Sequence, residues 1–139
     1  MASACESDPI LAAHAHYLYF DFHTECRKMR FDRVSVLIDR LTPSLEAMGW
    51  YHSQSTGPGL ANVNVISKQK GVIRTNCMDC LDRTNVTQSA LARWALNKQF
   101  RAAGILSHKE SIEDHAEFMT MFRNGKLSCF CCVSTEVVS

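Results

Sequence analysis

The chain has 139 residues, 46% hydrophobic and 21% charged, which is the composition of an ordinary soluble globular protein and predicts at most one domain. Its formal net charge of +1 is too small for the chain as a whole to attract a polyanion, so we expect no nucleic-acid partner. The seven cysteines are odd in number and irregularly spaced, and no secretory signal precedes them, which favours a reducing compartment. No run approaches the roughly 20 apolar residues that cross a bilayer, so we expect no transmembrane segment.

The first third of the chain is expected to hold a strand followed by helices. The aromatic run Tyr17–Phe22 favours a buried strand. Apolar positions at helical spacing predict a helix over Thr24–Leu41, with Val34, Leu37, Ile38 and Leu41 on its inward face. Pro43 lacks an amide proton, so it should end or kink that helix and start a second short one over Pro43–Met48.

The middle of the chain predicts two strands joined by a tight turn. Ser53–Gly59 is rich in turn residues and is expected to be a loop. Alternation of valine and asparagine predicts a strand over Ala61–Ser67, and Gly71–Thr75 should form the next one. We expect these two strands to pair as a hairpin around the turn at 68–70.

Two further helices are predicted. One covers Asn85–Phe100, with Asn85 and Gln88 as a capping pair and Gly104 as its stop signal. The other covers Ser111–Phe122, with Ile112, either His115 or Ala116, Met119 and Phe122 on one stripe. Residues 1–124 are predicted to form the domain, and residues 125–139 a divergent, disordered tail.

The most informative stretch joins Gly71–Thr75 to the helix that begins near Asn85. It contains Cys77, five intervening residues, Arg83 and then Thr84, the spacing of a cysteine phosphatase loop. A loop at a helix N-terminus offers amide donors to a phosphate, and Arg83 adds a bidentate fork. The same field should lower the pKa of Cys77 and make it a nucleophile, with Thr84 easing its later departure. The short pattern alone is common in proteins. The interpretation as a phosphatase loop depends on the strand expected before it and the helix expected after it.

Two carboxyl groups inside the loop favour a phosphatase whose general acid belongs to the loop itself. Asp79 and Asp82 would lie beside a bound dianion, and mutual repulsion raises carboxyl pKa values. A protonated carboxyl is what a general acid needs to protonate a leaving inositol oxygen. We favour Asp82 as this acid, with Asp79 as the competitor. No metal ion or other cofactor is needed, because Arg83 and the loop amides supply the charge stabilisation.

The stretch R-T-N-C-M-D-C-L-D-R-T-N-V resembles the signature of the Sac-domain phosphoinositide phosphatases. Y-F-D-F-H-T-E-C-R-K-M-R-F-D-R upstream and Q-S-A-L-A-R-W-A-L downstream resemble the same family, so the likeness runs from about Tyr17 to Asn124. The two acids are also similar to those of the myotubularin lipid phosphatases, whose acid lies in the loop. The resemblance implies an α/β fold, here an incomplete cysteine-phosphatase-like domain with a strand–phosphate loop–helix core and flanking helices.

The resemblance also implies an activity. The chain should hydrolyse the monoester of phosphatidylinositol phosphates, most often the 4-phosphate, at the cytosolic face of endoplasmic reticulum or Golgi membranes. By carry-over, Cys77 matches the family's nucleophile and Arg83 its phosphate-binding arginine. The expected substrate-binding residues are those of the loop and its flanks, namely Met78, Cys80, Leu81, Arg83, Thr84 and Arg74.

Several alternatives remain open at this stage. Family members extend further in both directions, so the chain is expected to be truncated, and an inactive product that at most binds phosphoinositide is the main rival. Cys77 and Cys80 could form half of a zinc site, although the tail lacks a matching pair. Cys129, Cys131 and Cys132 could be lipidated. The basic residues between Arg27 and Arg33 could meet an anionic head group or form a solvated helix face.

Overall fold

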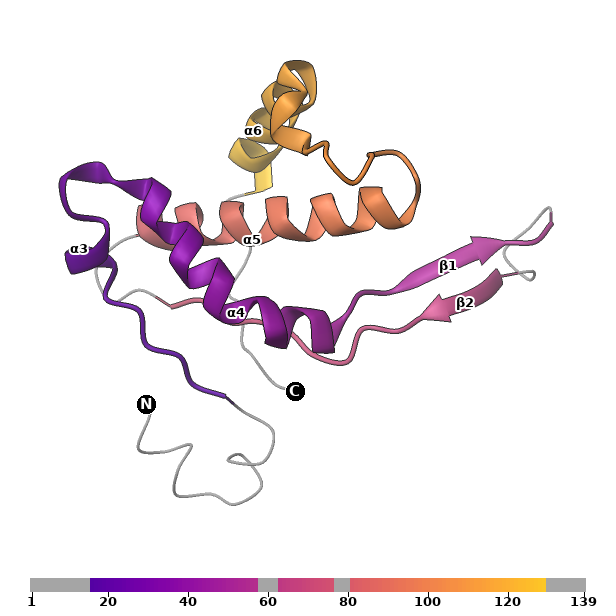
Figure 1. The fold of residues 1–139 in the computed structure, drawn as a ribbon, viewed down its shortest axis with the longest axis horizontal. Coiled ribbons are helices and arrows are strands. Elements are labelled where there is room, and N and C mark those ends of the chain that lie inside the picture. Colours follow the sequence, from indigo (N-terminus) through magenta and orange to yellow (C-terminus); the bar gives the residue numbers. More distant parts are fainter. Residues whose placement is uncertain (1–15, 58–62, 77–80, 130–139) are drawn as a thin grey trace. The chain divides into compact units, whose positions relative to one another are not determined.

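The computed structural model describes residues 16–57, 63–76 and 81–129, which contain helices and two strands (Figure 1). They form two compact units, each described by itself. The first unit takes its described residues from Met1–Asp21 and Asp39–Thr75. The second takes them from Phe22–Ile38 and from Asn76 onwards. The mixed content agrees with the predicted α/β class.

The first unit contains a two-stranded antiparallel hairpin. Strand β1 (His52–Ser55) pairs with β2 (Val63–Ser67), and Ser55 lies opposite Val63. The strand predicted over Ala61–Ser67 is therefore confirmed for its described part, Val63–Ser67, but the predicted partner is wrong, because residues expected to be a loop form β1. In the sequence, Gly-Pro-Gly at 57–59 is a stronger turn signal than Lys-Gln-Lys at 68–70, where the hairpin turn was predicted.

The segment after β2 is tied to a helix end instead of to a strand. The Lys70 amide donates to the Met48 carbonyl at 2.8 Å, and the Ser67 hydroxyl donates to the Trp50 carbonyl at 2.7 Å. Gly71 is buried so close to Met48 that a Cβ there would lie 2.9 Å from the Met48 Cγ. Residues 71–76 adopt no regular structure, so the strand predicted over Gly71–Thr75 is wrong.

Helix α4 (Val34–Met48) runs through the proline that was expected to interrupt it. Pro43 lies inside this continuous helix, and the separate Pro43–Met48 helix is therefore wrong as predicted. A proline costs about 3 kcal/mol in a helix interior, which burial of the helix's apolar face can offset. Of the four positions that the periodicity indicated, Val34, Leu37 and Ile38 are buried on α4, whereas Leu41 is half-buried. Gly49, at φ 63°, follows its last residue in the left-handed conformation.

The aromatic run before α4 is not a strand. Residues 16–21 are irregular, with Tyr17 59% and Tyr19 69% exposed, and β1 and β2 are the only strands in the described ranges. Phe22 already belongs to a helix, α3 (Phe22–Glu25). The aromatic content was misleading because a strand needs a partner to satisfy its backbone groups.

The second unit begins with a sequence of short turns. After α3 come the 3-10 segments η1 (Arg27–Met29) and η2 (Phe31–Arg33). Lys28 has φ 60° and ψ 38°, a left-handed conformation that breaks the helical path. The single helix predicted over Thr24–Leu41 is therefore wrong in its first part: α3 ends at Glu25, and α-helix resumes only at Val34.

Helix α5 (Leu81–Ala102) is the longest element of the second unit and begins directly after the loop. It starts earlier than predicted, so Asn85 is not a cap: it lies inside the helix, where its carbonyl accepts from the Ser89 hydroxyl at 2.7 Å. Gly104, at φ 72°, follows the helix end in the left-handed conformation, as expected. The helix after the loop is thus confirmed, whereas the strand before it is absent from residues 71–76.

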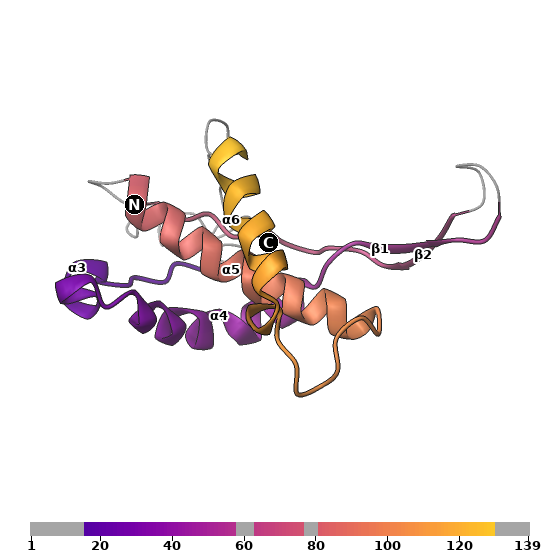
Figure 2. The same ribbon diagram turned by 90° about the horizontal axis from the view of Figure 1, so that it is seen from above.

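Helix α6 (Ala116–Cys129) runs across α5, as Figures 1 and 2 show. Ile112 and Met119 of the predicted stripe are buried, and Phe122 packs against their cluster. The single helix predicted over Ser111–Phe122 is nevertheless wrong, because His115 is extended and α6 begins only at Ala116. Residues 112–114 form the 3-10 segment η3 (Ile112–Asp114), capped by Ser111. The Asn97 side chain of α5 accepts from the Ile112 amide at 2.9 Å and donates to Glu113 at 3.1 Å. The second unit therefore has its core where α5 and α6 meet. The tail predicted to be disordered from residue 125 is wrong over residues 125–129, which belong to α6, and its remainder from residue 130 lies outside the described residues.

Candidate active site

The structure describes some of the predicted loop residues and leaves others outside the described ranges. Met78, Asp79 and the two cysteines at 77 and 80 lie outside the described residues, as does the side chain of Leu81. Asp82, Arg83 and Thr84 lie in the first turns of α5. Arg74 belongs to the other unit. The structure therefore places Arg83, the residue expected to bind phosphate, at the positive end of a 22-residue helix.

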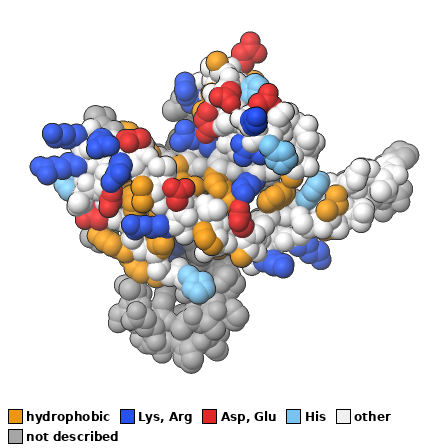
Figure 3. Space-filling model, viewed as in Figure 1, with side chains coloured by type: hydrophobic (Ala, Val, Ile, Leu, Met, Phe, Trp, Pro, Cys, Tyr) orange, Lys and Arg blue, Asp and Glu red, His pale blue; other side chains and the backbone are white. Residues whose placement is uncertain are grey.

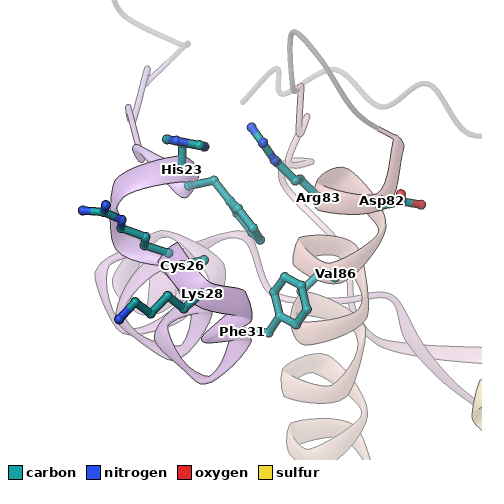
Figure 4. Close-up of a pocket in the computed structure, with 9 residues that line it drawn as sticks. His23, Cys26, Lys28, Phe31, Asp82, Arg83 and Val86 are labelled. Carbon is teal, nitrogen blue, oxygen red and sulfur yellow. The ribbon is translucent and has the colours of Figure 1, made fainter.

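A pocket of about 280 Å³ adjoins this end of α5 within the second unit (Figure 4). Asp82, Arg83 and Val86 of α5 line one side of it. The α3–η2 segment lines the other side with Phe22, His23, Cys26, Arg27, Lys28 and Phe31. The pocket thus brings Arg83 together with a segment about 55 residues earlier in the chain, which sequence analysis did not connect to it.

Side-chain directions divide the polar lining residues into two groups. His23 and Arg83 point toward one another across the pocket, whereas the ammonium end of Lys28 and the carboxylate of Asp82 point away from it (Figure 4). The lower part is apolar, with the Phe22 and Phe31 rings 6.1 Å apart between centroids. The pocket therefore has an apolar floor and, at its mouth, two nitrogen-bearing groups that face each other.

The basic residues around the pocket do not form the continuous helix face considered from the sequence. Arg33 pairs with Glu25 at 3.6 Å and Arg30 with Asp32 at 3.7 Å, so acids accompany these two cations. Figure 3 shows Lys and Arg side chains gathered over the end of the molecule that Figure 1 labels α3. The surplus positive charge comes from Arg27 and Lys28, both exposed and both lining the pocket.

Cys26 contributes a thiol to the pocket wall, and it is only 6% exposed. Burial raises the pKa of this thiol, and the nearby carboxylates of Asp32 and Glu25 raise it further, with Arg33 acting in the opposite direction. A neutral thiol neither repels an anion nor attacks phosphorus. Cys26 is therefore a structural cysteine, unlike the nucleophile expected at position 77.

The raised pKa of Cys26 predicts a pH-dependent stability. The unfolded chain ionises this thiol at its ordinary value, ~8.5, whereas the folded chain holds it neutral to higher pH. Its contribution is therefore complete below about pH 8 and is lost as pH rises through the folded value. Urea unfolding at about pH 7.5 and 9.5 should show a larger fall in stability for the parent chain than for Cys26→Ala. Equal falls in the two chains would contradict this assignment.

Across residues 16–57, 63–76 and 81–129, no cluster of three metal-ligand side chains occurs. Within those ranges, no helix has the length and apolar character of a membrane span. The cysteines of the alternative zinc site, at positions 77 and 80, lie outside the described residues, so that alternative stays a prediction.

Comparison with known proteins identifies the family. Phosphatidylinositol-3-phosphatase SAC1 of Saccharomyces cerevisiae is 46% identical over 110 residues, which are 78% of this chain and 18% of the relative. The aligned part of this chain belongs to the Sac-domain phosphoinositide phosphatase family. Phosphatidylinositol-3-phosphatase SAC1-A of Danio rerio is 44% identical over 109 residues, covering 78% of this chain and 18% of the relative. Phosphoinositide phosphatase SAC8 of Arabidopsis thaliana is 39% identical over 107 residues, covering 77% and 17%.

The chain spans about a sixth of the length of these Sac-domain relatives, between 17% and 18% of each. No family model matches it. The resemblance drawn from the loop signature is therefore confirmed at the level of the family. His23 is the pocket residue that sequence reasoning left without a role. Its position in the family-like segment was the available signal, but no spacing rule linked it to Arg83.

Proposed function

We propose that this chain carries the nucleophile segment of a phosphoinositide phosphatase and hydrolyses phosphate monoesters of phosphatidylinositol through a phosphocysteine. The observation that carries the proposal is the pocket at the start of α5, with Arg83 pointing into it directly after a loop of phosphatase spacing. Membership of the Sac-domain family supports the same chemistry.

In the first step, the Cys77 thiolate attacks phosphorus in line with the leaving inositol oxygen. The sulfur–phosphorus bond forms as the bond from phosphorus to that oxygen breaks. Arg83 binds two equatorial oxygens bidentately, and the positive end of α5 stabilises their charge. An in-loop carboxyl gives its proton to the inositol oxygen, which leaves as a neutral alcohol.

In the second step, water attacks the phosphocysteine and the thiolate departs. The carboxylate left by the first step accepts a proton from that water, so inorganic phosphate is released and the carboxyl is restored. Thr84 donates a hydrogen bond to the departing thiolate. In this scheme Arg83 and the loop amides carry the charge stabilisation, and the proposed reaction requires no metal ion.

The in-loop acid is assigned by a leaving-group test. Asp82→Asn is expected to lower lipid turnover by about 10²-fold or more, because a general acid contributes 10²–10⁴-fold. Turnover of p-nitrophenyl phosphate should fall much less, because that leaving group needs no proton. Rates of phosphate and nitrophenol release measure the two effects.

Asp79→Asn is the matched comparison. The Asp82 carboxylate points away from Arg83 (Figure 4), which makes Asp79 a serious competitor for the role. If the selective loss appears for Asp79→Asn instead, the acid is Asp79. If neither variant distinguishes the two substrates, the proposal of an in-loop acid is wrong.

The proposed substrate is a monophosphorylated phosphatidylinositol on a cytosolic membrane face. Sequence resemblance favours the 4-phosphate and membranes of the endoplasmic reticulum or Golgi, whereas the names of the yeast and zebrafish relatives specify a 3-phosphatase. The pocket's apolar floor and basic mouth suit either head group. Our proposal is for the 4-phosphate, with the 3-phosphate as the direct comparison.

The test is release of inorganic phosphate by the full 139-residue chain from vesicles that contain one lipid or the other, with EDTA present. We expect release that depends on Cys77 and is faster from the 4-phosphate. Faster release from the 3-phosphate would reverse the positional assignment alone. Release from neither lipid above that of the Cys77→Ser chain would contradict the proposed function and favour an inactive chain that retains the loop.

A further inference from the structure

His23 reaches the pocket through the geometry of α3. This helix has four residues, Phe22–Glu25, and begins with Phe22, whose ring contacts Phe31 at 6.1 Å between centroids. That aromatic contact orients the start of the helix over the apolar floor. The next residue, His23, is exposed at the mouth, and its ring points toward Arg83 (Figure 4).

The other charged groups near His23 are paired with one another, turned away from the pocket or exposed. On its own segment, Glu25 pairs with Arg33 at 3.6 Å, and Asp32 of η2 pairs with Arg30 at 3.7 Å. Lys28 of η1 lines the pocket but turns its ammonium end away (Figure 4). Asp82 of α5 turns its carboxylate away as well, and the exposed Arg27 completes the charged lining.

Two hydrogen-bond donors that face each other do not attract one another. A guanidinium has only donors, and a histidine ring has at least one N–H in either protonation state. Such a pair is favourable when an anion lies between the two groups and accepts from both. A phosphate monoester has oxygens on all sides and fits this requirement. The neutral thiol of Cys26 and the apolar floor add no repulsion.

We propose that His23 is a substrate-binding residue of this pocket, which donates a hydrogen bond to the phosphate monoester that Arg83 holds from the opposite side. The proposal rests on the proposed function for the identity of the ligand. It adds a wall to the site from a segment that precedes the nucleophile loop by more than 50 residues.

Three variants test the role by turnover. His23→Leu removes the N–H groups at similar size and should raise KM for phosphatidylinositol 4-phosphate by about 10- to 100-fold, the range of a hydrogen bond to a charged group. His23→Gln keeps an N–H donor and should recover KM to within about 5-fold of the parent chain. His108→Leu, at an exposed histidine beyond the end of α5, should leave KM and kcat unchanged.

The variants also separate binding from folding. Thermal melting followed by circular dichroism should give the parent, His23→Leu and His23→Gln the same midpoint within a few degrees. Loss of activity in His23→Leu without rescue by His23→Gln overturns the proposed hydrogen bond. Equal KM values in the parent and both His23 variants also overturn it, while leaving the proposed phosphatase function intact.

A binding measurement keeps the inference testable without turnover. In the Cys77→Ser chain, we expect the ring C–H resonances of His23 to move on addition of short-chain phosphatidylinositol 4-phosphate, while those of His108 stay in place. Inorganic phosphate is the second probe: a shift with both ligands assigns recognition to the phosphate, and a shift with the lipid alone assigns it to the whole head group. No shift of His23 with either ligand overturns the inference, whether or not the parent chain releases phosphate.

Discussion

Replacement of Cys77 by serine is expected to lower phosphate release by about 10⁴-fold or more, because loss of a catalytic nucleophile removes the covalent route altogether. A serine hydroxyl is a far weaker nucleophile than a thiolate held at a helix N-terminus. The second readout is a covalent intermediate. The parent chain, quenched in acid during turnover of lipid labelled with ³²P, should carry label, and Cys77→Ser should carry none.

Cys129→Ser, at the last residue of α6, is the matched control and should release phosphate at the parent rate. Retention of activity in Cys77→Ser would rule out the phosphocysteine. Loss of turnover without any labelled protein in the parent chain would point to direct attack by water, with Cys77 in another role.

Replacement of Arg83 by alanine is expected to lower kcat/KM by about 10³-fold, because arginines that stabilise transferred phosphoryl groups contribute 10³–10⁵-fold. Two structural features suit Arg83 to bind a phosphate: it lies in the first turn of α5, and it points into the pocket (Figure 4). Arg83→Lys keeps the charge but not the bidentate fork, so it should recover only part of the loss. Steady-state rates on vesicles measure both variants.

Arg93→Ala on the same helix provides the control. Arg93 lies 3.9 Å from Glu113, an exposed pair whose loss should leave kcat/KM within about 2-fold of the parent. If Arg83→Ala and Arg93→Ala behave alike, Arg83 does not bind the transferred phosphate. Full recovery in Arg83→Lys would show that charge alone matters and that the bidentate geometry is unnecessary.

The helices of the second unit were the most predictable part of the fold. Their apolar stripes are long, and Ile112 and Met119 are buried as predicted, although Ile112 lies in η3 and not in the helix α6. The ends were less predictable because capping signals compete: Asn85 looked like a cap, yet α5 begins at Leu81. The resemblance at the loop signature correctly identified the family, but it could not show which side chains meet there.

The strands were harder because pairing partners decide them. Tyr17–Phe22 has strand propensity, but residues 16–21 have no strand partner in the described chain and stay irregular. Ser53 and Ser55 have weak propensity and still form β1, since β2 lies opposite. Similarly, the left-handed backbone at Lys28 interrupts a helix that periodicity extends without a break. The pattern of a single sequence shows neither which strands pair nor where the backbone adopts a left-handed conformation.

The two hydrogen bonds that the Asn97 side chain makes to residues 112 and 113 have a consequence for the order of folding. The two groups it binds, Ile112 and Glu113, are only 15 and 16 residues away along the chain. Closing so short a loop carries a modest entropic penalty, and contacts of low sequence separation form quickly. We therefore expect the pair α5–α6 to form early and to offer the start of α5 as a ready surface on which the more distant α3 segment condenses. Pulsed amide exchange should then protect α5 and α6 before α3.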